Sequence, residues 1–157
     1  MFCIEADEAN YELLVKNLRP GIDNKRIVAI HAAINNTNDL VYLKRSAHSY
    51  NSQLSTAVTN FPVKGIRMQQ LLHDYNITHI DILKIDIEGA ESLLFNDDCS
   101  WLQITGAIII EVHSEENLQQ FTAAVAPYGF RIEKKNFENE DLYYAFNPAY
   151  TSIISST

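Results

Sequence analysis

The chain has 157 residues and a formal net charge of −8, and 46% of its residues are hydrophobic against 20% charged, which fits one folded domain of ordinary size. The acidic charge argues against nonspecific nucleic-acid binding, which needs clustered lysine and arginine. No apolar run approaches the roughly 20 residues that span a bilayer and the N-terminus shows no signal-peptide pattern, so we expect a cytoplasmic protein that binds neither nucleic acid nor membrane.

The first half of the chain alternates strand and helix patterns. "FCIE" (2–5) predicts a short strand, and Asp7 predicts the N-cap of a helix over 8–18 that Pro20-Gly21 ends. The further elements expected in this half are strands over 26–34 and 40–45, a polar loop over 46–62 and a helix over 66–75. The strand over 40–45 is expected to be antiparallel or peripheral.

The second half repeats the alternation. The elements expected here are strands over 80–86, 107–113, 130–135 and 142–147, and helices over about 89–95 and 115–126. Ser114 predicts the N-cap of the last helix. Strands that alternate with helices predict an α/β fold with a largely parallel sheet. Cys3 and Cys99 form no C-x-x-C motif and are expected to be reduced thiols.

Charged residues interrupt an apolar strand in "LKIDIEGAE" (83–91). A period of two places Lys84, Asp86 and Glu88 on one face, where isolated charges are costly unless they are paired. A salt bridge of Lys84 with a carboxylate is the structural alternative. The strand ends of open α/β sheets are where ligands bind, so the cluster also predicts a site.

The strand over 107–113 ends in a second polar pair. Glu111 and His113 share one face of that strand. Two polar clusters at neighbouring strand ends favour a functional site over a salt bridge alone. Together with Asp86 and Glu88, the pair could bind a hard or borderline cation, and the sequence does not distinguish a metal site, as in a metal-dependent hydrolase, from acid–base use.

These stretches together resemble the FkbM family of S-adenosylmethionine-dependent methyltransferases. The segments that carry the resemblance are "FCIEADEANYELLVKNL", "NSQLS", "VKGIRMQQLL", "IDILKIDIEGAE" and "IIIEVH". The most specific of them is the D-x-E-G-x-E run from Asp86 to Glu91. The resemblance implies a Rossmann-like class I methyltransferase sheet with a C-terminal antiparallel strand.

The resemblance also implies roles for individual residues. Glu5 would bind the ribose of S-adenosylmethionine, and Ala32 and Ala33 would lie near its adenine. Asp86 would lie beside the methionine part or the acceptor. The residues expected to line the acceptor side are Lys84, Glu88, Glu111 and His113. Methyl transfer to a hydroxyl usually needs a base, for which His113 is the first candidate, since its reference pKa lies near neutral, and Asp86 the alternative.

One departure from the family concerns the glycine-rich turn that wraps the cofactor. The five glycines lie far apart and no G-x-G occurs. We therefore expect residues 1–157 to be a single methyltransferase domain that lacks an N-terminal strand and helix and that binds cofactor weakly or not at all.

Two functional readings follow. The first is O-methyl transfer to a hydroxyl of a sugar, polyketide or related metabolite, so that the partner is a small molecule or a glycan. The second is a non-catalytic remnant or binding module. A gap in the sheet would leave strand edges open to self-association, so a homo-oligomer is also an expectation.

Overall fold

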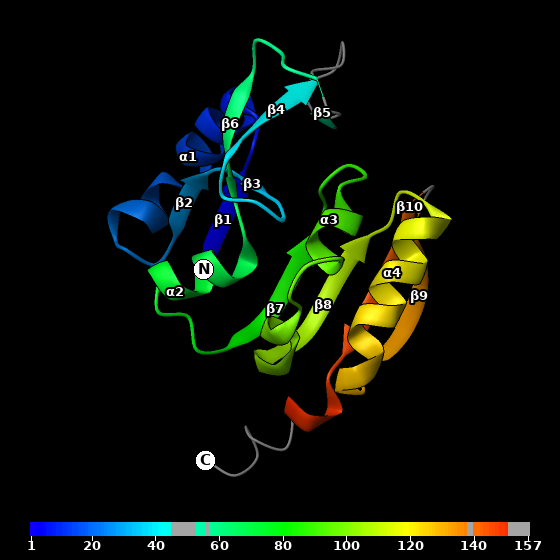
Figure 1. Cartoon of the computed structure of the whole chain (residues 1–157). Helices are drawn as coiled ribbons and strands as arrows, with labels where there is room; N and C mark the ends of the chain where they lie inside the picture. The colour runs from blue at the N-terminus through cyan, green and yellow to red at the C-terminus, as the bar shows by residue number, and fades with distance from the viewer. Residues whose placement is uncertain (45–52, 56, 138–139, 151–157) are drawn as a thin grey trace. The chain divides into compact units, whose positions relative to one another are not determined.

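The computed structural model describes residues 1–44, 53–55, 57–137 and 140–150. The chain divides into two compact units, residues 1–67 and 68–157, and each is described by itself (Figure 1). Among the described residues, no helix is long and apolar enough to cross a membrane.

The first unit begins with a strand, a helix and a parallel strand. β1 (Phe2–Glu5) pairs with β2 (Val28–His31), and α1 (Glu8–Asp23) connects them. The carboxylate of Asp7 accepts hydrogen bonds from the N–H groups of Ala9 and Asn10, which leaves fewer of the first-turn N–H groups unpaired. The predicted strand over 2–5 and the predicted cap are both confirmed.

The predicted end of this helix is wrong, because α1 continues through Pro20 and Gly21 to Asp23. Proline removes one N–H donor, which costs a single bond near the end of the helix. Gly21 does not end the helix; it lies within α1. A Cβ there would lie 2.3 Å from Cδ1 of Ile27, so glycine allows the chain to turn back closely against the helix end.

The first unit also holds a four-stranded sheet. Its strands are β3 (Ala33–Ile34), β6 (Pro62–Ile66), β4 (Leu40–Lys44) and β5 (Gln53–Ser55), in that order across the sheet. β4 is antiparallel to both neighbours, as expected, and buried Ala33, Leu43 and Val63 form a core cluster. Two expectations change: the strand predicted over 26–34 is divided into β2 and β3, and the predicted loop over 46–62 contains β5 and the first residue of β6. Residues 45–52 and 56 of that region lie outside the described residues.

The second unit contains one sheet with helices on its connections. Its elements are α2 (Met68–Asp74), β7 (Ile80–Ile85), α3 (Glu91–Phe95), the 3₁₀ turn Ser100–Ile104, β8 (Thr105–Glu111), α4 (Glu115–Val125), the 3₁₀ turn Ala126–Tyr128, β9 (Arg131–Phe137) and β10 (Glu140–Phe146). The sheet order is β7-β8-β10-β9, and these four strands lie side by side in Figure 1. Ile66, predicted as the start of a helix, instead ends β6.

The strand directions correct the expectation of a largely parallel sheet. Among the described strands, β1–β2, β3–β6 and β7–β8 are parallel. The other four pairings, β4–β5, β4–β6, β8–β10 and β9–β10, are antiparallel. The expected C-terminal antiparallel strand is present as β10, which lies between β8 and β9. The fold is therefore α/β with mixed sheets.

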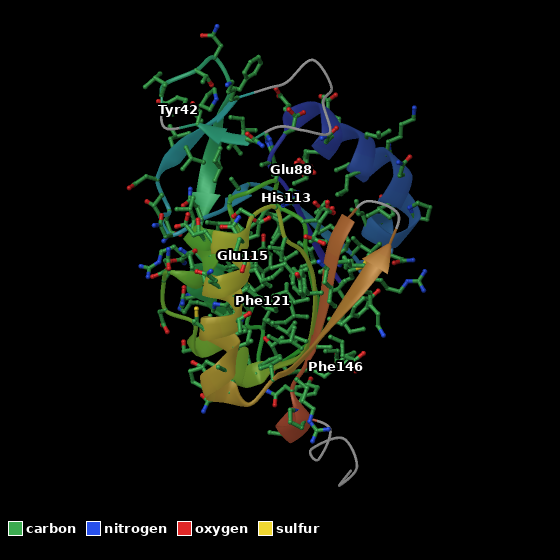
Figure 2. All side chains as sticks on the ribbon, turned by 90° about the vertical axis from the view of Figure 1, so that its right-hand side faces the viewer. Tyr42, Glu88, His113, Glu115, Phe121 and Phe146 are labelled. Atoms are coloured by element: carbon green, nitrogen blue, oxygen red, sulfur yellow. The ribbon has the colours of Figure 1, made fainter. Side chains whose placement is uncertain are left out.

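The core of the second unit lies between its helices and the sheet. Phe121 of α4, labelled in Figure 2, is fully buried, as are Ile108 and Ile110 of β8. The ring of Phe121 lies 5.2 Å from that of Phe95, so α3 and α4 pack on each other. Each such side chain contributes roughly 1.5–3 kcal/mol by leaving water. This packing fixes the ends of β7 and β8, from which the polar clusters project.

Candidate functional site

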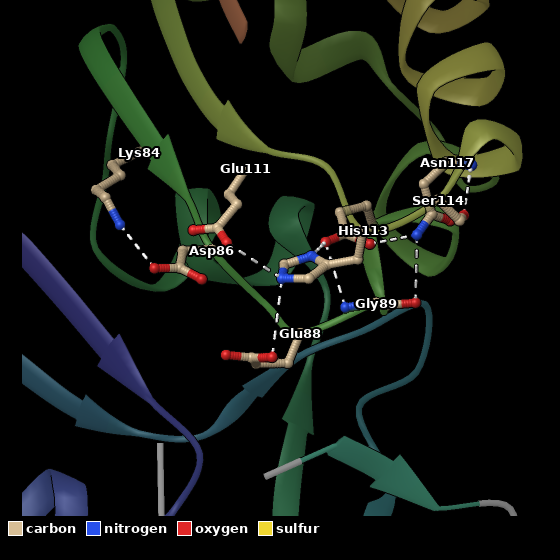
Figure 3. A network of polar contacts seen from close by, with 9 residues as sticks. Lys84, Asp86, Glu88, Gly89, Glu111, His113, Ser114 and Asn117 are labelled. Atoms are coloured by element: carbon tan, nitrogen blue, oxygen red, sulfur yellow. Dashed lines mark hydrogen bonds and ion pairs between the residues drawn. The ribbon is translucent and has the colours of Figure 1, made fainter. Parts of the chain in front are cut away.

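The two polar clusters meet because β7 and β8 are parallel neighbours. Ile85, the last residue of β7, lies opposite Ile110, so Asp86 follows β7 at the edge where Glu111 ends β8. The carboxyl ends of parallel strands share one edge of a sheet. The structure therefore brings together the two clusters that the sequence placed at separate strand ends (Figure 3).

A tight turn leads from β7 into α3. Glu88 has a φ of 51° and Gly89 a φ of 89°, both in the left-handed region that favours glycine. A left-handed residue other than glycine costs on the order of 1 kcal/mol or more. Because of this turn, Glu88 does not simply continue the alternation of the strand, and its carboxylate faces the imidazole of His113 in Figure 3.

A buried carboxylate holds the imidazole from the other side. Nδ1 of His113 lies 2.5 Å from Oε1 of Glu91, whose side chain is 0% exposed. The amide of Asn117 donates to Oε2 of Glu91, and the N–H of Gly89 lies 3.3 Å from Oε1. Three donors thus surround this carboxylate, which is how a buried charge is stabilised.

The second ring nitrogen of His113 faces acids. Its Nε2 lies 3.5 Å from Oε1 of Glu111 and 3.7 Å from Oε2 of Glu88. Burial lowers the pKa of His113, but the hydrogen bond and charge of Glu91, with the charges of Glu88 and Glu111, outweigh it and raise that pKa above 6.5. The imidazole is thus a stronger base than an isolated histidine.

Lys84 and Asp86 form an ion pair at the edge of this cluster. Nζ of Lys84 lies 2.8 Å from Oδ2 of Asp86, and both side chains are exposed to solvent. This is the salt bridge that the sequence left open as the alternative. It stabilises the fold little, because exposed ion pairs contribute only about 0–1 kcal/mol. The pair lies at one side of the polar cluster that also contains His113.

The cluster has the composition of a cation site as well. One ligand atom each of Asp86, Glu88 and His113 lies within 4.8 Å of the other two. A tetrahedral ion at about 2.1 Å from each would draw those atoms to about 3.4 Å from one another. Lys84 already pairs with Asp86, whereas one proton on His113 offsets only one of the three carboxylates around the ring, those of Glu88, Glu91 and Glu111. The cluster therefore keeps a net negative charge, which suits either a proton or a cation.

Of the four residues expected at the cofactor, Glu5, Ala32 and Ala33 belong to the first unit, and Asp86 belongs to the second. Glu5 ends β1, and the N–H of Asp7 donates to its Oε1 at 2.8 Å. Burial raises the pKa of Glu5 despite the backbone hydrogen bonds from Asp7 and Ala6. A carboxylate offers about four acceptor positions, so Glu5 retains the capacity to accept from ribose hydroxyls. Ala32 and Ala33 are buried, and Ala33 packs in the core of its own unit.

Two residues of the polar network were missed by reasoning from the sequence. The sequence analysis considered Glu91 only as the last acid of the D-x-E-G-x-E motif and Asn117 only as a residue of the helix over 115–126. The available signal was Glu91 itself, a charge at the start of the apolar helix Glu91–Phe95. Its partner His113 is 22 residues away in the sequence, and only the folded chain shows that pairing.

A family match agrees with this architecture. The family described as "Methyltransferase FkbM domain" matches residues 2–143, which is most of the chain. The match defines the class of the protein, a methyltransferase domain. Within that class, the chain belongs to the FkbM family, as its motifs indicated. Searches of curated proteins and of solved structures gave no match.

Proposed function

We propose that the domain is an S-adenosylmethionine-dependent O-methyltransferase whose acceptor is a hydroxyl of a sugar, a polyketide or a related metabolite. The observation that carries the proposal is the environment of His113. His113 follows the end of β8, and the buried carboxylate of Glu91 in α3 holds its imidazole, in a chain that belongs to a methyltransferase family.

His113 is the general base in this proposal. A hydroxyl must lose its proton as its oxygen bonds the methyl carbon, and a positioned base typically contributes about 10²–10⁴-fold. Nδ1 of His113 is engaged by Glu91, so Nε2 is the atom that takes the proton. S-adenosylmethionine, when bound, supplies the methyl group on a cationic sulfonium.

The acids around Nε2 suit a polyhydroxylated acceptor. Ionised carboxylates only accept hydrogen bonds, and hydroxyls donate them, so Glu88 and Glu111 would orient neighbouring hydroxyls of the acceptor. The Lys84 ammonium and the Asp86 carboxylate offer one donor group and one acceptor group at the same edge. Such positioning lowers the barrier of an in-line displacement.

The cofactor side of the proposal depends on the first unit. Glu5 would accept hydrogen bonds from the ribose hydroxyls, since it ends a parallel strand and retains acceptor capacity. Ala32 and Ala33 follow the next parallel strand, β2, and would border the adenine. Asp86 would bind the methionine part, where a carboxylate also favours the positive sulfonium.

The test is methyl transfer from methyl-labelled S-adenosylmethionine to a panel of monosaccharides and polyols. His113→Asn keeps an amide donor near Glu91 and removes Nε2, and Glu115→Gln, at an exposed position of α4, is the matched control. We expect transfer by the unaltered chain and the control, and a loss of at least about 100-fold in His113→Asn. Equal rates in His113→Asn would remove His113 from the reaction. Absence of transfer to every acceptor, together with no cofactor binding, would favour a binding module.

A further inference from the structure

We propose that Glu91 is the positioning residue for His113: it fixes the proton on Nδ1 and thereby directs the basic lone pair of Nε2 into the acid-lined edge of the sheet. This inference rests on the proposed function of His113 as a base. Its structural part, the control of the imidazole by Glu91, can be measured without any methyl transfer.

The tautomer follows from the chemistry of the contact. Oε1 of Glu91 lies 2.5 Å from Nδ1 of His113. An ionised carboxylate has no proton to donate, so Nδ1 carries the hydrogen. In the neutral imidazole the lone pair then belongs to Nε2, the atom that faces Glu88 and Glu111.

The orientation of Glu91 is fixed in turn by its own partners. Its side chain is fully buried, and the Asn117 amide donates to its Oε2. The N–H of Asn117 is held by the hydroxyl of Ser114 at 3.1 Å. The N-terminal turn of α4 thus holds the carboxylate, and the carboxylate holds the imidazole. Burial makes the pairing strong, because screening by water is weak there.

The charged and polar groups around His113 and Glu91 come from four parts of the second unit. The acids near the ring are Asp86 and Glu88 after β7, Glu91 of α3 and Glu111 of β8, and Asn117 of α4 contacts Glu91. The acids other than Glu91 are partly exposed, so water and salt screen them. Glu91 is the buried one, and its Oε1 contacts Nδ1 of His113.

The experiment is a pH titration of the histidine ring resonances by NMR on the full chain. The chain has five histidines, and His113→Asn assigns the signal of His113. The variants are Glu91→Gln, which keeps the shape and removes the charge, and Glu115→Gln as an exposed control. In Glu91→Gln, a flip of the Asn117 side-chain amide lets its oxygen accept from the new NH₂ group, so the contact between the two side chains can persist. Glu91→Asp, which keeps the charge, serves if Glu91→Gln does not fold.

We expect the unaltered chain to show an Nδ1–H tautomer and a His113 pKa above 6.5. Glu91→Gln should lower that pKa, whereas Glu91→Asp and Glu115→Gln should leave it raised. In methyl transfer, the rise of rate with pH should move to lower pH in Glu91→Gln, and kcat should fall at least tenfold with little change in the acceptor KM.

Two results separate this inference from the proposed function. A His113 pKa and tautomer that are the same in Glu91→Gln as in the unaltered chain would overturn the role of Glu91, even if methyl transfer occurs. A lowered pKa in Glu91→Gln, in a chain that transfers no methyl group to any acceptor, would support the control of His113 by Glu91 and contradict the proposed reaction.

Discussion

Nζ of Lys84 lies 2.8 Å from Oδ2 of Asp86, across the point where β7 ends. The two residues are two positions apart, and the backbone of β7 is extended as far as Ile85, so both side chains project from one face. The pair sits beside the imidazole of His113, within reach of a ligand that touches both.

Substitution of Asp86 tests whether this pair belongs to the site. Asp86→Ala should abolish methyl transfer, with a loss of at least about 100-fold, because it removes the carboxylate proposed to bind the methionine part and takes the ion-pair partner from Lys84. The matched control is Asp23→Ala, which breaks an exposed pair with Arg19 in α1. Near-full activity of Asp86→Ala in a labelled-methyl assay would remove Asp86 from the site.

The stability of the fold should depend on the charge of His113. Its pKa is raised in the folded chain above 6.5, so the proton stabilises the fold. This stability is fully present below about pH 6.5, the unfolded value. It is lost as the pH rises through the folded pKa. Urea unfolding midpoints across that range should fall for the unaltered chain.

The same titration in His113→Asn is the control for this effect. Asparagine does not titrate, so its unfolding midpoint should vary less with pH above 6.5 than that of the unaltered chain. Parallel curves for the two proteins would show that the interaction of His113 with Glu91 does not contribute to stability. The raised pKa of Glu5 acts at lower pH, since its ordinary value is 4.5.

Cys99 should react slowly with thiol reagents. Burial, together with the charges of Asp98 and Asp97, raises the pKa of its thiol to about 11, and its Sγ lies 3.4 Å from the carbonyl oxygen of Phe95. The thiolate is the reactive form. In a Cys3→Ser variant, labelling by a disulfide reagent at pH 8 should be slow when folded and fast in denaturant. Fast labelling of the folded variant would contradict this environment.

Removal of the N-cap of α1 should lower the stability of the chain by the amount typical of a helix cap. Asp7 is buried, and Oδ1 accepts from the N–H groups of Ala9 and Asn10. Asp7→Ala should lower the free energy of unfolding by about 1 kcal/mol, and Asp7→Ser should recover most of it. An unchanged midpoint in urea for Asp7→Ala would show that the cap does not stabilise the helix.

Local signals were read well from the sequence, because they depend on neighbouring residues. The cap at Ser114 accepts from the N–H of Asn117 as expected, and Glu111 lies near His113 as the period of a strand requires. Pro20 and Gly21 were misread as a helix end. The helix continues through both residues to Asp23, and Gly21 instead leaves room for the side chain of Ile27.

Features that depend on distant pairing were predicted only in part. The antiparallel directions of β4 and β10 were expected, but alternation of strands and helices suggested a largely parallel sheet, and four of the described pairings are antiparallel. The burial of Glu91 depends on His113 and Asn117 together. A charged residue is rarely buried without such partners, and the sequence does not show which partners Glu91 has. From the sequence alone, Glu91 therefore looks like an ordinary exposed acid.

The most direct test of the account is calorimetric titration of the chain with S-adenosylhomocysteine, the product of the proposed reaction. Glu5→Ala removes the proposed ribose ligand, and Glu12→Ala, at an exposed position of α1, is the control. The missing G-x-G turn led us to expect weak binding or none, whereas the proposed function requires saturable binding by the unaltered chain and by Glu12→Ala, weakened at least tenfold in Glu5→Ala, which is about 1.4 kcal/mol. No binding by a chain that is demonstrably folded would contradict it.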